Sequence, residues 1–160
     1  MAALTWTDAL ALQQPRMDDT HREFVDLLNG VEDALEAESD VLTQALDAFV
    51  QHTEAHFGQE DGWMRHIGFA AESCHSVQHA QVLELVREVR RRLTEQADVA
   101  VVRALVPALA EWFPIHAQTM DAGLAISMQE VGYDTETGAM ARPLEPAAPA
   151  KAGCGSVGCG

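Results

Sequence analysis

Apolar residues recur every three to four positions along most of the chain, which is the period of an α-helix with one buried face. Four such stretches follow one another, at about residues 19–37, 40–65, 71–95 and 98–130. The chain shows no useful strand alternation and no internal repeat. Four amphipathic helices joined by short connections predict an all-α protein, an antiparallel up-down four-helix bundle.

Local signals mark the ends of these helices. Ser39 and Asp40 are residues that favour a helix N-terminus, and Gly68 interrupts the apolar period at the end of the second helix. Pro107 and Pro114 lie inside the fourth helix, where each removes a backbone hydrogen bond. We therefore expect the fourth helix to bend.

Two flanking segments lack the helical period. Residues 1–17 form an N-terminal arm of mixed polarity, and residues 138–160 are rich in Ala, Pro and Gly. The sequence predicts a bundle domain over 1–137 and a flexible C-terminal tail. Cys154 and Cys159 in this tail either bind a metal or form a redox pair, or else the tail has no function.

Composition narrows the classes of function. The chain has 10 basic and 25 acidic residues, a net charge of −15, so phosphate backbones and anionic membranes repel it. No stretch approaches 18 uncharged apolar residues, which argues against a membrane span. The N-terminus lacks the basic start of a signal peptide, and three cysteines are an odd count for a disulfide framework. We expect a cytoplasmic monomer that does not bind nucleic acid.

Histidines and acids cluster at helical spacing in three segments, "HTEAHFGQE" from residue 52, "HSVQH" from residue 75 and "HAQTMD" from residue 116. Residues four apart share one face of a helix, and the spaced pairs fall on apolar stripes. One histidine on such a stripe is usually a hydrogen-bonded core residue. Five histidines and two carboxylates from four helices instead predict a metal site. Imidazole and carboxylate without thiolate fit iron, manganese or zinc, and so many ligands need two ions.

The segments "MDDTHREFVDLLN", "HTEAHFGQED", "HSVQH" and "WFPIHAQTMD" resemble the hemerythrin family in its single-domain bacterial form, over about residues 4–130. The resemblance implies two non-haem iron ions joined by an oxo or hydroxo bridge. It also implies how the side chains are shared. One iron would take His75, His79 and His116, the other would take His21 and His56, and Glu60 and Asp121 would bridge the pair.

This ligand count implies a function. If both carboxylates and one further oxygen bridge the irons, each iron has three oxygen ligands. Three imidazoles then complete six ligands at one iron, while two imidazoles leave one position open for dioxygen at the other. Five neutral imidazoles make a less anionic centre than the glutamate-rich di-iron oxidases have. The interpretation is therefore reversible dioxygen binding for delivery, storage or sensing, and not an enzyme. The alternatives are an enzyme that reduces peroxide or nitric oxide, or an iron-buffering or signalling module.

The spacing in the fourth helix predicts an irregularity. His116 and Asp121 are five residues apart, so in a regular α-helix their directions differ by about 140°. A single wider π-type turn between about 113 and 121 would bring them to roughly 50° and turn Asp121 inward. Phe113 lies about 60° from His116 in projection and is expected to line the oxygen pocket.

The remaining histidines and Cys74 are less suitably placed to bind a metal ion. His52 lies on the flank of its apolar stripe, which predicts a surface residue or one behind the ligands. His66 lies off the stripe near a helix end and is expected to face solvent. Cys74 precedes a predicted ligand but points to another face, and is expected to be a small buried residue.

Overall fold

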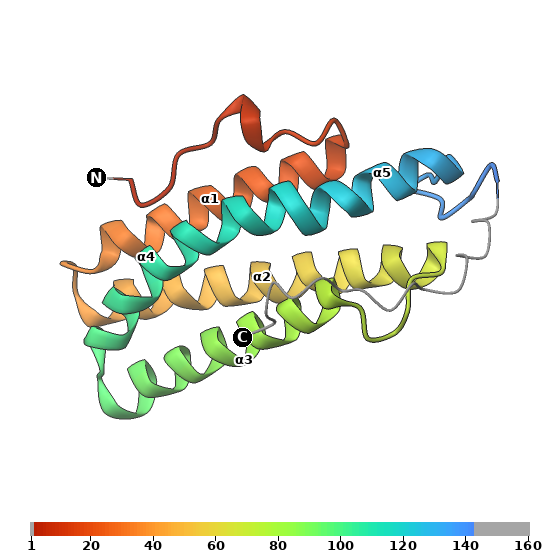
Figure 1. The fold of residues 1–160 in the computed structure, drawn as a ribbon. Helices are drawn as coiled ribbons and strands as arrows, with labels where there is room; N and C mark the ends of the chain where they lie inside the picture. The colour runs from red at the N-terminus through yellow and green to blue at the C-terminus, as the bar shows by residue number, and fades with distance from the viewer. Residues whose placement is uncertain (1, 143–160) are drawn as a thin grey trace.

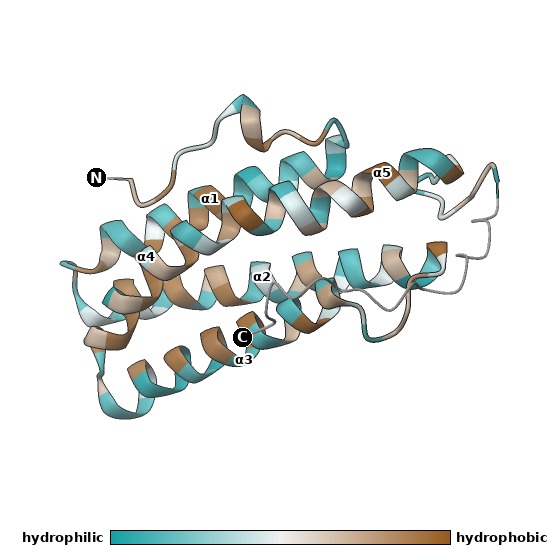
Figure 2. Cartoon of the chain, in the orientation of Figure 1, coloured by the Kyte–Doolittle hydropathy of each residue, from teal (hydrophilic) through white to brown (hydrophobic). Residues whose placement is uncertain are grey.

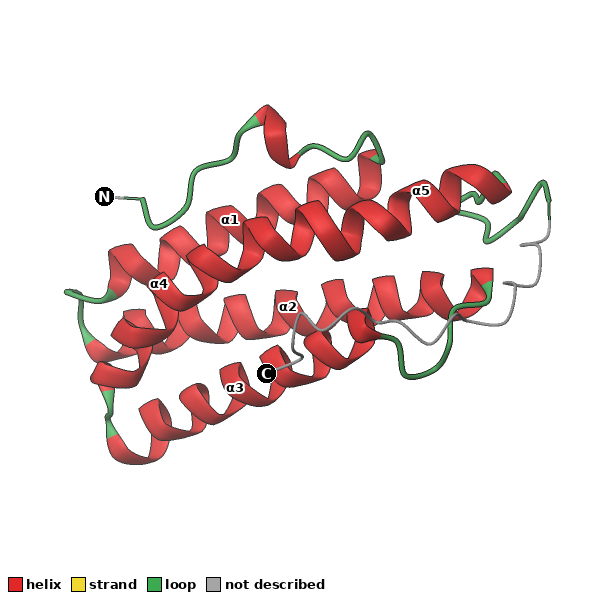
Figure 3. Cartoon of the chain, viewed as in Figure 1, coloured by secondary structure: helices red, strands yellow, loops and turns green. Residues whose placement is uncertain are grey.

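The computed structural model describes residues 2–142 and has an up-down bundle of four antiparallel helical rods (Figure 1). The elements are α1 (Pro15–Ala34), α2 (Ser39–Ile67), α3 (Cys74–Gln96) and α4 (Val99–His116), which continues through the π-helical turn η2 (Ala117–Asp121) into α5 (Ala122–Val131). A single 3₁₀ turn, η1 (Asp8–Leu10), interrupts the arm. Within residues 2–142 there is no strand, only an isolated bridge between Tyr133 and Met140 (Figure 3). The predicted fold class is confirmed.

Each helix packs against its neighbours in the chain, and α1 also packs on α4, which closes the ring. Apolar positions face the inside of this ring and polar positions cover the outside (Figure 2). The arm runs along the outside of α1 (Figure 1). Asn29 of α1 holds the arm by exchanging two hydrogen bonds with the backbone of Leu4.

The first helix begins earlier than the periodicity predicted. It starts at Pro15 rather than near residue 19, so the arm ends at Gln14 and not at residue 17. Proline suits the first turn because its missing N–H has no partner there in any case. The Gln14 side chain then accepts a hydrogen bond from the Met17 amide at 2.9 Å. The helix also ends earlier than predicted, at Ala34.

The connection between α2 and α3 follows from its residues. Gly68 ends α2 in a left-handed conformation, with φ of 97°, as its position in the sequence predicted. The third helix begins at Cys74 rather than near residue 71, because Ser73 caps it in a reciprocal pair of hydrogen bonds with Ser76. The ligand pair on α3 therefore lies within its first two turns.

The fourth rod is α-helical through both Pro107 and Pro114, and the bend that we expect at these residues stays a prediction. By length and composition alone, the continuous run Val99–Val131 could cross a membrane. One such helix is weak evidence, because the core helix of a bundle passes the same test. Its apolar face packs on α3 and α1 here. The absence of a membrane span also stays a prediction.

The apolar core has two parts. The larger cluster includes Phe24, Phe49 and Phe57, and the smaller includes Met17 and Trp63. A layer of buried polar residues lies between the two clusters. On α1, for example, His21 lies between Met17 and Phe24, and on α2 Glu60 lies between Phe57 and Trp63.

The end of the described chain returns to the bundle. The amide of Ala141 donates to the carbonyl of Val131, at the end of α5. The first residues of the predicted tail are therefore attached to the bundle, and the domain boundary at residue 137 stays a prediction. The rest of the tail, with Cys154 and Cys159, lies outside the described residues.

Candidate metal centre

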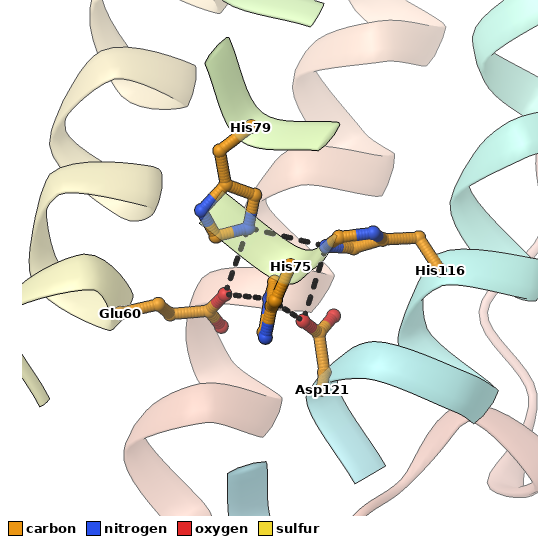
Figure 4. Close-up of side chains that lie close together, drawn as sticks. All are labelled: Glu60, His75, His79, His116 and Asp121. Atoms are coloured by element: carbon orange, nitrogen blue, oxygen red, sulfur yellow. Dashed lines mark hydrogen bonds and ion pairs between the residues drawn. The ribbon is translucent and has the colours of Figure 1, made fainter. Parts of the chain in front are cut away.

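All seven side chains predicted to hold metal meet in the buried polar layer, and none is more than 3% exposed. They come from all four rods of the bundle. They form two groups that could each hold an ion and that share one carboxylate. The larger group, drawn in Figure 4, contains Glu60, His75, His79, His116 and Asp121, and the smaller contains His21, His56 and Glu60.

Glu60 of α2 lies between two sets of imidazoles. Its Oε1 is 3.1 Å from Nε2 of His56 and 3.5 Å from Nε2 of His21. Its Oε2 is 3.4 Å from Nε2 of His79 and 3.5 Å from Nε2 of His75. The two oxygens of one carboxylate thus face different histidine pairs.

Asp121 divides its oxygens in the same way from the opposite side (Figure 4). Its Oδ1 is 2.9 Å from Nε2 of His75 and 3.2 Å from Nε2 of His116. Its Oδ2 is 3.2 Å from Nε2 of His21. Each carboxylate therefore spans the same two sides of the centre.

The wide turn predicted in the fourth rod is confirmed. The segment Ala117–Asp121 is π-helical, and Asp121 is fully buried. Without this turn, the directions of His116 and Asp121 would differ by about 140°. Pro114 has no N–H to bond back to the preceding turn, so the helical ladder is already interrupted just before the widening. The irregular turn brings both side chains to one centre.

The two carboxylates stay ionised although they are buried. Burial raises the pKa of Glu60, but the electrostatic interaction with His56 and the contacts with neighbouring imidazoles outweigh burial and hold this pKa well below its usual value. Burial and the charge of Glu60 raise the pKa of Asp121, but its contacts with His116 and other imidazoles again lower it overall. The centre therefore offers anionic oxygens, which suit a cation.

Three imidazoles of the centre, those of His21, His75 and His79, have a pKa above that of free histidine. Burial lowers the pKa of His21, but its contacts with Asp121 and Glu60 outweigh this effect and raise the pKa to about 9. His75 has the same balance of causes and also rises to about 9. Burial lowers the pKa of His116 instead. A proton on an imidazole takes the position that a metal ion would hold against the same carboxylates.

The donor atoms fit a metal. Five inward-facing atoms are buried and make no hydrogen bond with any described residue, only close approaches between imidazole and carboxylate. They are Nε2 of His21, Nε2 of His75, Oε2 of Glu60 and both carboxylate oxygens of Asp121. Buried polar atoms without hydrogen bonds are costly, and a cation in the centre would give them partners.

The sequence did not predict two residues that accept hydrogen bonds from the outer nitrogens of ligand imidazoles. Nδ1 of His79 donates to the Asp61 carboxylate at 2.8 Å, and Nδ1 of His116 donates to the Gln78 amide oxygen at 2.9 Å. The only available signal was adjacency, since Asp61 follows Glu60 and Gln78 precedes His79.

Aromatic rings line the rest of the centre. Phe57 stacks on His79 with ring centroids 4.0 Å apart, and Trp112 stacks on His116 at 4.3 Å. Phe113 is fully buried, and its ring lies 5.2 Å from that of His21 in an edge-to-face contact. The predicted pocket residue therefore contacts the half of the centre with fewer imidazoles.

The other histidines lie outside the centre. His52 is half-buried behind His56, where its Nε2 donates to the carbonyl of Thr20 at 3.1 Å. This position agrees with the prediction of a surface residue or one behind the ligands. His66 is exposed as predicted, and its Nδ1 lies 3.1 Å from the hydroxyl of Tyr133.

The prediction for Cys74 is corrected in one respect. It is half-buried rather than buried, because it is the first residue of α3 and not an interior position of that helix. It belongs to neither of the two groups of possible ligands found in residues 2–142.

Comparison with known proteins agrees with this geometry. The family model described as "Hemerythrin HHE cation binding domain" matches residues 14–125. The chain is 41% identical over 141 residues to a bacteriohemerythrin of Ralstonia nicotianae, covering 88% of this chain and all of the relative. It is 28% identical over 143 residues to a bacteriohemerythrin of Pseudomonas aeruginosa, covering 86% of this chain and 92% of the relative.

Proposed function

Because the chain belongs to the hemerythrin family, we propose that it binds dioxygen reversibly at a non-haem di-iron centre, for oxygen delivery, storage or sensing. One observation carries the proposal. Five imidazoles divide unequally, three and two, between the two sides of the same pair of carboxylates. An unequal division gives two ions with different numbers of protein ligands.

The proposed ligands follow the distances in the centre. Glu60 and Asp121 would hold both irons, because each carboxylate turns one oxygen toward either side of the centre. One iron takes the three imidazoles that face Oε2 of Glu60 or Oδ1 of Asp121, and the other takes the two that face Oε1 of Glu60. The first set is His75, His79 and His116, and the second is His21 and His56.

The difference in ligand number supports a proposal for where oxygen binds. Three imidazoles would hold one iron and two would hold the other, so the second iron would have fewer protein ligands and could accept dioxygen. Phe113 packs against His21, on the side with fewer imidazoles. We propose that its ring lines the oxygen pocket and keeps water away from the bound gas.

The type of ligand favours a carrier over an oxidase. Neutral imidazoles outnumber carboxylates, so the centre stabilises high-valent iron less than glutamate-rich bundle sites do. When bound, the iron pair would supply electrons to dioxygen, and the buried aromatic rings of Phe57 and Phe113 would limit the access of protons. An enzyme that reduces peroxide or nitric oxide, and an iron-buffering or signalling module, are the alternatives.

The cellular setting is also part of the proposal. A net charge of −15 does not suit nucleic acid or an anionic membrane surface as a partner. We propose a cytoplasmic monomer whose ligand is dioxygen, with residues 1–137 as the functional domain.

Reversibility can be measured directly. Iron-loaded protein is reduced without air, exposed to air and then returned to an oxygen-free atmosphere, while its visible spectrum is recorded. A carrier gains a coloured oxygenated spectrum in air and returns to its first spectrum when oxygen is removed, with two irons per chain by elemental analysis. Prompt, irreversible oxidation together with turnover of peroxide or nitric oxide would favour an enzyme and contradict the proposal.

Metal removal is expected to destabilise the fold. A ligand that binds only the native state stabilises it, by about 4 kcal/mol when present at 1,000 times its dissociation constant. Chelation should therefore lower the unfolding temperature, because the buried carboxylates of Glu60 and Asp121 lose their cations. Circular dichroism melts with and without chelator measure this shift. Re-addition of Fe²⁺ should restore the higher temperature, and equal melts in all three states would contradict the expectation.

A further inference from the structure

Asp61 holds His79 from the side opposite to the centre. It follows Glu60 directly on α2, so the two side chains point about 100° apart. Oε2 of Glu60 lies 3.4 Å from Nε2 of His79, while Oδ1 of Asp61 accepts from Nδ1 of the same ring at 2.8 Å. Two consecutive residues thus contact both nitrogens of one imidazole. Glu60 is fully buried, whereas the Asp61 side chain is 27% exposed.

Gln78 repeats the arrangement one helix further on. It precedes His79 on α3, and its amide oxygen accepts from Nδ1 of His116 on α4 at 2.9 Å. Both imidazoles are therefore fixed with their Nε2 atoms toward the centre. One outer acceptor is an anion and the other is neutral. These contacts link α2 to α3 and α3 to α4 through the imidazoles themselves.

The other half of the centre lacks such support. Nδ1 of His21 and Nδ1 of His56 are both buried, and neither has a hydrogen-bond partner among the described residues. Aromatic rings surround them instead, with Phe113 against His21 and Phe57 against His56. The two halves differ in how firmly their imidazoles are oriented as well as in ligand number.

A hydrogen bond from the outer ring nitrogen fixes the tautomer of a metal-binding imidazole and makes its inner nitrogen a stronger donor. An anionic acceptor does this more strongly than a neutral one. We propose that Asp61 is a positioning residue that makes the three-histidine half of the centre the first to bind metal and the last to release it. This inference rests on the proposed dinuclear centre.

Cobalt tests the inference without any oxygen chemistry. Metal-free protein is titrated with Co²⁺, and binding is followed by visible absorption and by the number of ions retained after desalting. The parent should bind two ions in two steps of different affinity. Asp61→Asn keeps the size of the side chain and removes its charge, so the tighter step should weaken by about 10- to 100-fold while the weaker step stays unchanged.

Two further variants separate position from general damage. Asp61→Glu restores the charge and should recover part of the tight step. Asp47→Asn is a matched control, because Asp47 is an exposed aspartate of α2 that also bonds to α3, through Arg90, far from the centre. It should bind Co²⁺ like the parent. Melting curves of the metal-free variants check that all of them fold.

The outcomes distinguish this inference from the proposed function. If the parent binds two ions and Asp61→Asn binds them with the same two affinities, Asp61 has no positioning role and the inference is overturned. If Asp61→Asn instead weakens the binding step of lower affinity, the proposal that the three-histidine half binds metal first is overturned. A parent that binds fewer than two ions would overturn the dinuclear centre itself, whatever the variants do.

Discussion

Glu60→Gln is expected to hold fewer than one iron per chain, and the parent is expected to hold two. The substitution keeps the shape of a fully buried side chain, so packing changes little. It removes the negative charge that faces four imidazoles and replaces one oxygen by an NH₂ group, which cannot bind a metal ion. Because Glu60 is the carboxylate shared by both groups of ligands, both ions should be affected. Elemental analysis of protein loaded with Fe²⁺ without air measures the loss.

The matched control lies on the same helix. Glu54 is exposed and accepts a hydrogen bond from Arg87 at 2.7 Å, so Glu54→Gln makes the same chemical change outside the centre. It should retain two irons. Equal iron contents in the two variants would mean that Glu60 is not a bridging ligand.

In Phe113→Ala, the oxygenated iron centre is expected to oxidise irreversibly several-fold faster than in the parent. The ring packs against His21 and stacks on Phe24, with centroids 4.4 Å apart, so its removal opens space beside the two-histidine half of the centre. Water entering this space would bring protons to the side of the centre where we propose that oxygen binds. Decay of the oxygenated spectrum in air measures the rate. The cavity should also cost about 3–5 kcal/mol of folding free energy.

Phe49→Ala separates the two effects. Phe49 is also fully buried and also contacts Phe24, at 5.0 Å, but it makes no ring contact with a histidine of the centre. Its loss should destabilise the fold to a similar degree while leaving oxidation close to the parent rate. If both variants oxidise equally fast, the faster oxidation follows from lower stability, and Phe113 does not protect the pocket.

The sequence predicted the helices because each buries one continuous apolar stripe. It predicted their ends less well. Pro15 interrupts the apolar pattern but is compatible with a first helical turn, so α1 reaches further back than the periodicity shows. Conversely, Ser73 caps α3 and excludes the residues before it. Ends depend on single hydrogen bonds, whereas helices depend on many apolar contacts.

The inward-facing residues of the centre could be predicted for the same reason. Histidines on an apolar stripe must face the inside of a bundle, and the misfit between His116 and Asp121 required the wide turn that the structure contains. Asp61 and Gln78 lie off their stripes, where a polar residue normally faces water. Only the packing of α2, α3 and α4 against one another brings them to the imidazoles.

The division of the core into two apolar clusters has a consequence for cooperativity. The smaller cluster joins the beginning of α1, the end of α2 and α5, and a layer of charged and polar side chains separates it from the larger one. Such a layer contributes little apolar contact between the two ends of the bundle. A metal pair bound by all four rods would couple the clusters into one unfolding unit. Without the metal, we expect the end that contains α5 to open as a separate unit while the larger cluster stays folded.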